Sequence, residues 1–562
     1  MRKLYKNIIC ILIMHVIIFV TLFWVYQLWN KKIDVPYFYI WGDASGFLGT
    51  IKNIAHGKSV VFYDDVYAFA LLKVISFFTS DVGVIANIYW LLGYFLAATF
   101  SYCFFRSLNF DYIVSVCSSV IFVFLPYHYL RLCHPGLCEC YSIPIAMYLL
   151  YYLIFGFYKD CDHKNMIREN IKVIVLVVMV AVGGIYYAFF AAILVFIFGI
   201  YSAFKYKNKY FIKMIIFTMI FGVLLLGFAF LVIPNLKDMI IYGNSVRDLN
   251  GLYVYSLNLM YMLLPIPGHR IDALDEFIRT IYAGTNLTRQ NEQYMAAMGF
   301  VMSLGFIISI MVKIFDINIP GRDKIKKLGM VNIVIVLIAI YGGFNILIGY
   351  FGTYIIRCYN RMSVFIALNS LVVVAIVIEE VIKKFDFKKI IQCFICLSLL
   401  IIAILDQTSA SYANYAALNE YMDMQYVYYY KDIEEYYYSL KMFAKELDDI
   451  SDENANIYMT TRDYPDPRLF TNIPIMRALT LSALFERDDI YIASEEDNVD
   501  DNYDWNEFVE NVIENNGEGI LLTRSYYPDE MADNIENIIK SYGFYEVYRV
   551  EYDDSVYFKS NK

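Results

Sequence analysis

Charge is scarce in this chain, and several other features are missing altogether. Asp, Glu, Lys and Arg make up only 18% of the 562 residues, whereas hydrophobic residues make up 59%. This composition excludes an ordinary soluble globular protein. No basic groove is present, which argues against a nucleic-acid partner. The ten cysteines all precede residue 400, and none of their spacings is that of a metal site.

Long apolar runs dominate the first 406 residues instead. They are long enough to cross the roughly 30 Å hydrocarbon core of a bilayer. The first run has no small-residue cleavage site, so we expect a retained helix. The uncharged run 173–204 would be about 50 Å long as one helix, so we expect a break at Gly183 and Gly184. The sequence predicts about eleven spanning helices, at residues 7–29, 83–105, 113–130, 140–157, 172–186, 187–204, 211–233, 297–315, 329–349, 363–382 and 390–405.

The basic residues predict how these helices are oriented. With the break at the two glycines, most Lys and Arg clusters fall on the side of the N-terminus, as the positive-inside rule requires. We therefore expect a multi-pass protein of the cell membrane with a cytoplasmic N-terminus. An odd number of spans places residues 407–562 outside the cytoplasm. This segment holds 33 Asp and Glu against 12 Lys and Arg, so it is an acidic domain on a basic membrane half (residues 1–406).

The acidic segment alternates between helical and extended patterns. The helical patterns cover 431–447, 505–515 and 529–542, and the extended ones cover 457–461, 519–524 and 546–558. This order predicts a small extracytoplasmic α/β domain over 407–562. Tyrosines gather at 428–430 and 436–438. Such side chains can stack on sugar rings or form the contact with the membrane half.

The first outer loop, residues 34–73, carries the sharpest motif, a carboxylate in the stretch Trp41-Gly42-Asp43-Ala44-Ser45-Gly46-Phe47. It directly follows the first spanning helix, where a substrate carried by a lipid would be met. Asp43 can act as the N-cap of a helix that begins near Ala44, as a catalytic group, or as both. Asp64 and Asp65, later in the loop, are typical of solvated turn residues.

Two further outer loops concentrate charge at membrane depth. His128, Arg131, His134 and Glu139 recur at about helical spacing in one short turn. Charged groups there are costly and tend to be functional, although Arg131 can also anchor the chain to head groups. In the loop 234–292, a Pro-Gly turn presents His269 and Arg270, a pair suited to a phosphate or equally to ordinary surface charge.

Arg357 and Arg361 open the tenth predicted span. They are four residues apart, so they share one face if this stretch is helical. Their outer position runs against the positive-inside trend. We therefore favour an anion clamp over simple anchoring.

At these residues the chain resembles bacterial polytopic glycosyltransferases of the GT-C architecture. The resemblance rests on GDASGF, PYHYLRLCH, LLPIPGHR, and IRCYNRMSVFIALN followed by Asp406-Gln407. It implies a GT-C-like membrane domain over 1–406 and a glycosyltransferase activity. A sugar would pass from a polyprenyl-phosphate carrier to an envelope or cell-surface glycan, or to a lipid-linked acceptor, on the outer face of the membrane.

The resemblance also implies roles for the outer residues. A carboxylate in the first outer loop, here Asp43, acts near the acceptor, where a hydroxyl attacking an anomeric carbon needs a proton acceptor. Some relatives bind a divalent cation through acidic residues. Asp43 has no acidic partner within its motif, so no metal ligand is assigned, and a divalent cation stays an open alternative. Cations stabilise the departing phosphate, and the candidates are Arg131, His134, His269, Arg270, Arg357 and Arg361. The candidates on the acceptor side are His128, Glu139, Asp64 and Asp65.

Two other classes of protein are compatible with the sequence. A transporter or flippase of a lipid-linked glycan should contain broken helices, often in repeated halves. The break at Gly183 and Gly184 has no matching second break, and no repeat is evident. A non-catalytic envelope assembly protein would use the acidic domain as its working part. The charged outer loops of the membrane half argue against that alternative.

Overall fold

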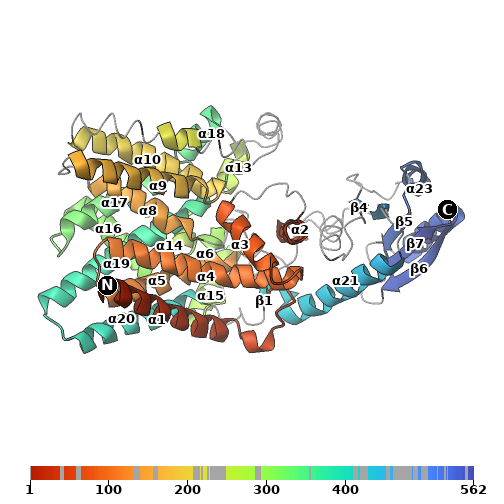
Figure 1. Ribbon diagram of the computed structural model, residues 1–562, viewed down its shortest axis with the longest axis horizontal. Coiled ribbons are helices and arrows are strands. Elements are labelled where there is room, and N and C mark those ends of the chain that lie inside the picture. Colours follow the sequence, from red (N-terminus) through yellow and green to blue (C-terminus); the bar gives the residue numbers. More distant parts are fainter. Residues whose placement is uncertain are drawn as a thin grey trace.

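The structure is a computed structural model of the chain (Figure 1). It describes residues 2–37, 43–57, 65–131, 134, 140–155, 163–206, 216, 219–224, 227, 249–266, 268–284, 293–352, 356–408, 415–417, 428–450, 456–459, 484, 491–494, 504–515, 517–524, 527, 529–550 and 555–561. A helical bundle contains the N-terminus, and a small sheet at the opposite end contains the C-terminus.

The described secondary structure of the membrane half is helical apart from two isolated β-bridges. Aspartates begin several of its helices: Asp65, Asp81 and Asp111 each accept hydrogen bonds from backbone N–H groups of the turn that follows. The first helices are α1 (Arg2–Val25), η1 (Leu28–Asn30), α2 (Asp43–Ala55), α3 (Val66–Ser76), α4 (Val82–Ser107), α5 (Tyr112–Val123), α6 (Pro126–Leu130), α8 (Ser142–Phe155), α9 (His163–Ala181) and α10 (Ile185–Tyr206). They are followed by α13 (Leu249–Val254), α14 (Leu259–Leu263), α15 (Asp272–Gly284), η3 (Gln293–Ala296), α16 (Gly299–Phe315), α17 (Arg322–Ala339), α18 (Asn345–Phe351), η4 (Tyr359–Met362), α19 (Ser363–Lys384) and α20 (Lys389–Gln407).

Five helical segments among the described residues are long and apolar enough to cross a membrane. They are Lys3–Val25, Val82–Ser107, Ile185–Tyr206, Tyr359–Lys384 and Lys389–Gln407. Four further apolar helices, α3, α5, α8 and α16, are shorter. A helical membrane protein is therefore supported. The predicted span 211–233 falls mostly outside the described residues.

The predicted helix break at Gly183 and Gly184 is confirmed. Helix α9 ends at Ala181 and α10 begins at Ile185. Gly183 forms an antiparallel β-bridge with Asp65, and Gly184 has a φ of +89°, a conformation that glycine adopts at little cost. The break therefore joins the first outer loop to the end of α9.

Two predicted spans are each divided in the structure. The span 113–130 is divided into α5 and α6, and Pro126 occupies the first turn of α6, where a missing N–H is tolerated. The span 329–349 ends early, because α17 stops at Ala339 and α18 begins separately at Asn345. Apolarity alone did not reveal these turns.

Small residues let α16, α17 and α19 pack closely. A Cβ atom on Gly305 would lie 2.2 Å from the Ser370 carbonyl oxygen. The buried amides are matched as well: Asn369 Nδ2 donates to Asn332 Oδ1 at 2.8 Å, and Tyr151 OH donates to Asn369 Oδ1 at 2.7 Å. A satisfied polar network of this kind fixes the register of helices in an apolar medium.

The C-terminal sheet has five strands in the order β4-β3-β5-β7-β6. β3 is parallel to β4 and β5, whereas β7 is antiparallel to β5 and β6. The elements are β1 (Tyr415–Ala417), β2 (Tyr428–Tyr429), α21 (Tyr430–Ile450), β3 (Asn456–Met459), β4 (Tyr491–Ser494), α23 (Trp505–Glu514), β5 (Gly519–Thr523), α24 (Asp529–Ser541), β6 (Phe544–Val550) and β7 (Ser555–Ser560). Each helix and strand predicted here from the sequence is present. β4 was not predicted, nor were β1 and β2, which form a separate two-stranded sheet.

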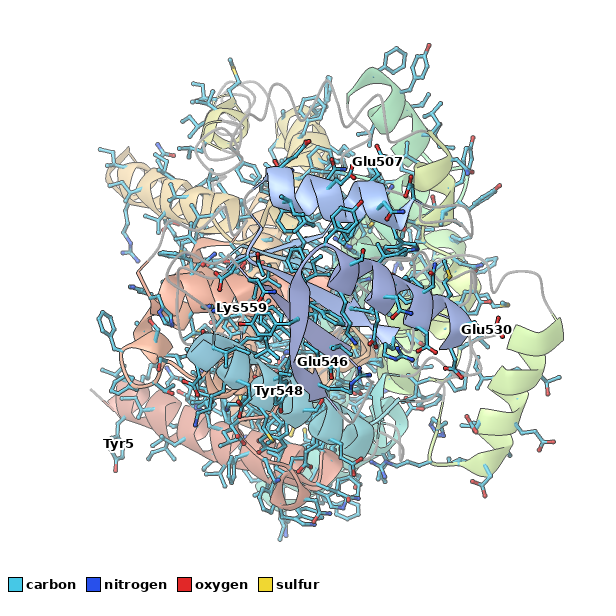
Figure 2. All side chains as sticks on the ribbon, turned by 90° about the vertical axis from the view of Figure 1, so that its right-hand side faces the viewer. Tyr5, Glu507, Glu530, Glu546, Tyr548 and Lys559 are labelled. Atoms are coloured by element: carbon cyan, nitrogen blue, oxygen red, sulfur yellow. The ribbon has the colours of Figure 1, made fainter. Side chains whose placement is uncertain are left out.

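The sheet lies between two layers of helix. Strand side chains alternate between its two faces, and each face packs on different helices. Leu521 packs with α21, whereas its neighbours Ile520 and Leu522 pack with α23 and α24. Figure 2 faces this end of the molecule, with Glu507 on α23, Glu530 on α24 and Glu546 on β6. Helix α21 extends from the sheet toward the membrane half (Figure 1).

Candidate functional site

Segments far apart in the sequence meet beside α6. Helix α6 contacts η3, and η3 contacts η4. The isolated bridge between Leu257 and Ile340 holds the segment between α13 and α14 against the end of α17. The residues that follow α6 and those of η4 are therefore both connected to η3.

Arg131 follows α6 directly and is completely buried. Its guanidinium carbon lies 4.6 Å from the centre of the Tyr127 ring, one turn earlier. The guanidinium carbon lies over the ring, which is a cation–π contact. The structure places Arg131 inside the protein, which argues against a simple anchor to lipid head groups.

Arg361, on η4, lies against a second tyrosine. It is 4% exposed, and its guanidinium carbon lies 4.2 Å from the centre of the Tyr186 ring. Tyr187, the next residue of α10, has its hydroxyl 3.0 Å from the Tyr127 hydroxyl. The contact between α6 and α10 therefore carries a buried arginine from each of two further segments, Arg131 after α6 and Arg361 on η4.

Asn360 adds a buried amide beside Arg361. Its side chain is 1% exposed, and neither amide atom has a hydrogen-bond partner among the described residues. The same is true of the Tyr359 and Ser363 hydroxyls. A buried polar group without a partner costs about 1–3 kcal/mol. Helix α19 begins at Ser363, and helix N-termini attract anions. Arg131, Arg361, Asn360 and Tyr127 form what we call the arginine site.

Arg357 does not share a helix face with Arg361, so that prediction is wrong. Residues 356–358 are not helical, η4 is a single 3-10 turn, and α19 starts only at Ser363. Arg357 instead lies 4.8 Å from the centre of the Tyr255 ring and packs beside Gly251 of α13. Arg357 and Arg361 therefore have different neighbours. Only Arg361 belongs to the arginine site.

His269 forms a pair with a carboxylate. Its Nε2 lies 3.4 Å from Asp406 Oδ1, and its Nδ1 accepts the Ile271 N–H at 3.0 Å. The second Asp406 oxygen accepts the Phe300 N–H at 2.5 Å, at the start of α16. Arg270 lies over Trp24 at 4.6 Å. These contacts hold the loop 268–270 against the ends of α16 and α20. His269 and Arg270 therefore have a structural role.

The two histidines near Arg131 differ in their surroundings. His128 is 1% exposed and stacks on Tyr94 with ring centres 3.8 Å apart. Its Nε2 has no hydrogen-bond partner among the described residues. His134 is half-buried, and its backbone N–H donates to the Arg131 carbonyl at 2.9 Å. The stacking makes His128 a core residue of the aromatic cluster beside the arginine site.

Asp65 is 4% exposed, so the prediction of a solvated turn residue is wrong for it. It caps α3, accepting the Tyr67 N–H at 2.8 Å, and it also accepts the Tyr141 hydroxyl at 2.8 Å. Asp43 is the first residue of α2, and its side chain is outside the described part, as are Asp64 and Glu139. Helix α2 packs on α3 and α4.

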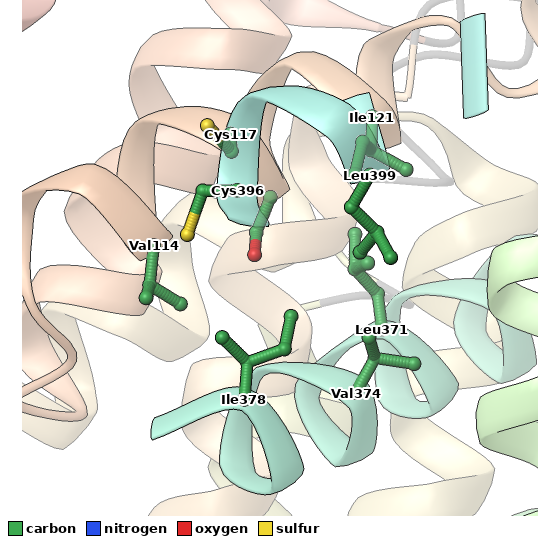
Figure 3. A pocket seen from close by; sticks show the side chains of 9 residues that line it. Val114, Cys117, Ile121, Leu371, Val374, Ile378, Cys396 and Leu399 are labelled. Carbon is green, nitrogen blue, oxygen red and sulfur yellow. The ribbon is translucent and has the colours of Figure 1, made fainter. Parts of the chain in front are cut away.

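Metal-binding groups and cavities add nothing to the arginine site. Among the described residues, no three His, Cys, Asp or Glu side chains are grouped so that they could hold a metal ion. A pocket between α5, α19 and α20 is lined by Val114, Cys117, Ser118, Ile121, Leu371, Val374, Ile378, Cys396 and Leu399 (Figure 3). It contains no charged side chain, so it is unsuited to a phosphate.

Comparison with models of known protein families finds no match, and comparison with curated proteins finds none either. The function of this chain is therefore inferred from the site itself. Sequence reasoning missed Tyr127, Tyr186 and Asn360. Their contacts join α6, α10 and η4, and no local spacing announces contacts between such distant segments.

Proposed function

We propose that the chain is a membrane glycosyltransferase that uses a sugar carried on polyprenyl phosphate. The observation that carries the proposal is the arginine site, in which Arg131 lies against Tyr127 and Arg361 lies against Tyr186, beside the N-terminus of α19. Such a group of donors and positive charge suits a phosphate. The apolar helices around it suit a lipid carrier.

In this proposal an acceptor hydroxyl attacks the anomeric carbon of the donor. The new carbon–oxygen bond forms as the bond to the phosphate oxygen breaks, and the bonding pair leaves on the phosphate. Asp43 takes the hydroxyl proton, and the arginine site stabilises the phosphate as its charge grows. Asp64 and Glu139 are the candidates on the acceptor side in this scheme, whereas His128 and Asp65 support the surrounding structure through their contacts with Tyr94 and Tyr141. An envelope glycan or a lipid-linked glycan is the acceptor.

The proposal also includes the finer topology. It takes the membrane half as a GT-C-like domain with about eleven spans, a cytoplasmic N-terminus and an extracytoplasmic C-terminal domain. The break at Gly183 and Gly184 supports the alternation on which this orientation depends. Labelling of single cysteines in intact cells would test it, because a cysteine in place of Glu530 should react without permeabilisation.

Binding of polyprenyl phosphate to the chain in lipid nanodiscs tests the proposed function. Arg131→Gln and Arg361→Gln should each weaken binding by about tenfold to a hundredfold, since each removes charge-assisted hydrogen bonds to an anion. Arg357→Gln is the matched control, because Arg357 lies against α13 and should bind nearly as the wild type does. Equal affinity in all four proteins would remove the arginine site from the reaction.

A flippase for a lipid-linked glycan is the second candidate, favoured by the broken helix between α9 and α10. It would also need an anion site. The two functions separate at Asp43. Asp43→Asn should stop sugar transfer, whereas a flippase with that substitution should still move a fluorescent polyprenyl-phosphate lipid between leaflets.

A further inference from the structure

Helix α21 belongs to both parts of the molecule. Its Leu440, Phe443 and Leu447 lie in the core of the sheet, whereas Tyr437, completely buried, belongs to the core of the membrane half. Figure 1 shows this helix extending between the two. This one helix therefore joins its contacts with the membrane half to the core of the sheet.

The first half of α21 contacts the segment that leads into α2. The Tyr438 hydroxyl is 3.0 Å from both carboxylate oxygens of Asp34. Lys441 Nζ lies 2.7 Å from Asp81 Oδ2 and 3.7 Å from Asp34 Oδ2. Lys32 Nζ lies 2.7 Å from Glu434 Oε1. We call the four α21 residues Glu434, Tyr437, Tyr438 and Lys441 the α21 dock.

The segment held by the α21 dock is also fixed from the membrane side. The Asn87 side chain donates to the Ile33 and Val35 carbonyls at 2.8 and 2.6 Å and accepts the Tyr37 N–H at 2.7 Å. A Cβ on Gly83 would lie 2.1 Å from the Asp34 carbonyl oxygen, so only glycine admits this approach. Residues 33–37 are thus clamped between α4 and α21.

The electrostatics of the dock favour the observed pairing. Burial, followed by the hydrogen bond to Asp34, raises the pKa of Tyr438 above its ordinary value. The phenol therefore stays protonated at neutral pH, and its O–H donates a hydrogen bond to the Asp34 carboxylate. Lys441 lies between two carboxylates, so its charge holds together two groups that would otherwise repel each other.

We propose that the C-terminal domain positions the first outer loop through the α21 dock, with Tyr438 and Lys441 as positioning residues for Asp43. The loop leaves the clamp at residue 37 and enters α2 at Asp43. The start of this loop, at Asp34, is therefore held by a residue about 400 positions later in the chain. The part that concerns Asp43 as a catalytic group rests on the proposed function, whereas the part that concerns the loop does not.

Hydrogen exchange of the full chain in nanodiscs tests the inference about the loop. Tyr438→Phe combined with Lys441→Glu should speed exchange of peptides from 31–57 by about tenfold, because hydrogen bonds to charged groups are lost and one is replaced by repulsion. Strands β5 and β7 should exchange as before. Lys441→Arg keeps the charge and should behave as the wild type, as should Met442→Ala, since Met442 is 65% exposed. Unchanged exchange of 31–57 in the double variant would overturn the proposal.

Sugar transfer is the second measurement. The double variant should lower kcat by about tenfold at nearly unchanged donor KM, because the loop serves the acceptor and the arginine site serves the donor. Unchanged kcat with faster exchange of 31–57 would overturn the link to Asp43. If the wild type transfers no sugar, the proposed function is wrong, and the exchange experiment still decides whether the dock holds the loop.

Discussion

Two pairs of arginines, one in each part of this molecule, are held in opposite ways. In the membrane half, Arg131 and Arg361 lie on the faces of Tyr127 and Tyr186. In the C-terminal domain, Arg524 and Arg549 both contact Glu536, and Arg549 also contacts Glu546 at 3.0 Å. An aromatic ring holds a guanidinium by its face, whereas a carboxylate engages its N–H edge.

The difference shows what each region is built to do. Lys540 lies 3.1 Å from Glu536 Oε2, and Asp533 lies 2.7 Å from Arg524. This second network therefore contains three cations and three carboxylates, and it links α24 to β6. It stabilises the sheet. The arginine site instead brings two buried arginines and a buried amide to the N-terminus of α19. We infer that the second arrangement is structural and the first is suited to an incoming anion.

The largest effect is expected from a substitution in the first outer loop. Asp43→Asn should lower sugar transfer by about a hundredfold to ten-thousandfold, since an amide cannot take the proton of the acceptor at neutral pH. The amide oxygen still accepts a hydrogen bond, so a role in starting α2 would be largely kept. Transfer rate and thermal stability should be measured together. Transfer near the wild-type rate would show that Asp43 is only structural.

The close packing behind the arginine site should be the next most sensitive feature. Gly305→Ala drives a Cβ into the Ser370 carbonyl of α19, and we expect a loss of about 2–3 kcal/mol of stability. Because α19 begins directly after η4, binding of polyprenyl phosphate should weaken too. Gly49→Ala is the control, since nothing lies within 4 Å of its Cβ position. Equal thermal midpoints for the two variants would contradict the packing argument.

Local sequence patterns predicted the helices and strands of this molecule better than they predicted its arginine site. The helices and strands of the C-terminal domain follow from their periodicity, and Gly183-Gly184 marks a break because a single helix there would be too long. Arg357 and Arg361 show the limit, since helical spacing suggested one face and the chain is not helical there. The grouping of Arg131 with Arg361 depends on how α6, η3 and η4 meet. Such tertiary contacts have no local signal in a single sequence.

The carboxylate network of the sheet should make the C-terminal domain sensitive to acid. Burial alone raises the pKa of Glu536, but hydrogen bonds from Lys540, Arg524 and Arg549 outweigh it, so its pKa lies below the ordinary 4.5. The folded state then binds fewer protons than the unfolded state. Stability from this group is therefore complete above pH 4.5 and is lost as the pH falls through the lowered pKa.

Substitution of Glu536 should remove this acid sensitivity. Glu536→Gln should cost about 1–2 kcal/mol at neutral pH and flatten the decline below pH 4.5. Hydrogen exchange of β5 and β7 measures both effects. Glu530→Gln on the same helix is the control, because Glu530 is exposed. A decline of the same size in Glu536→Gln would assign the acid sensitivity to other carboxylates.

The smallest effect is expected from the aromatic support of Arg361. Tyr186→Leu removes the ring 4.2 Å from the guanidinium, and a buried cation–π contact is worth about 1 kcal/mol. Binding of polyprenyl phosphate should weaken by about fivefold, with little change in stability. Tyr201→Leu is a matched control on the same helix, because Tyr201 lies under Lys205 at 5.2 Å, at the far end of α10. If both variants bind equally, the ring does not orient Arg361. If Tyr186→Leu weakens binding as much as Arg361→Gln does, the ring contacts the lipid phosphate or its sugar directly, and the face-on support of Arg361 is not its main role.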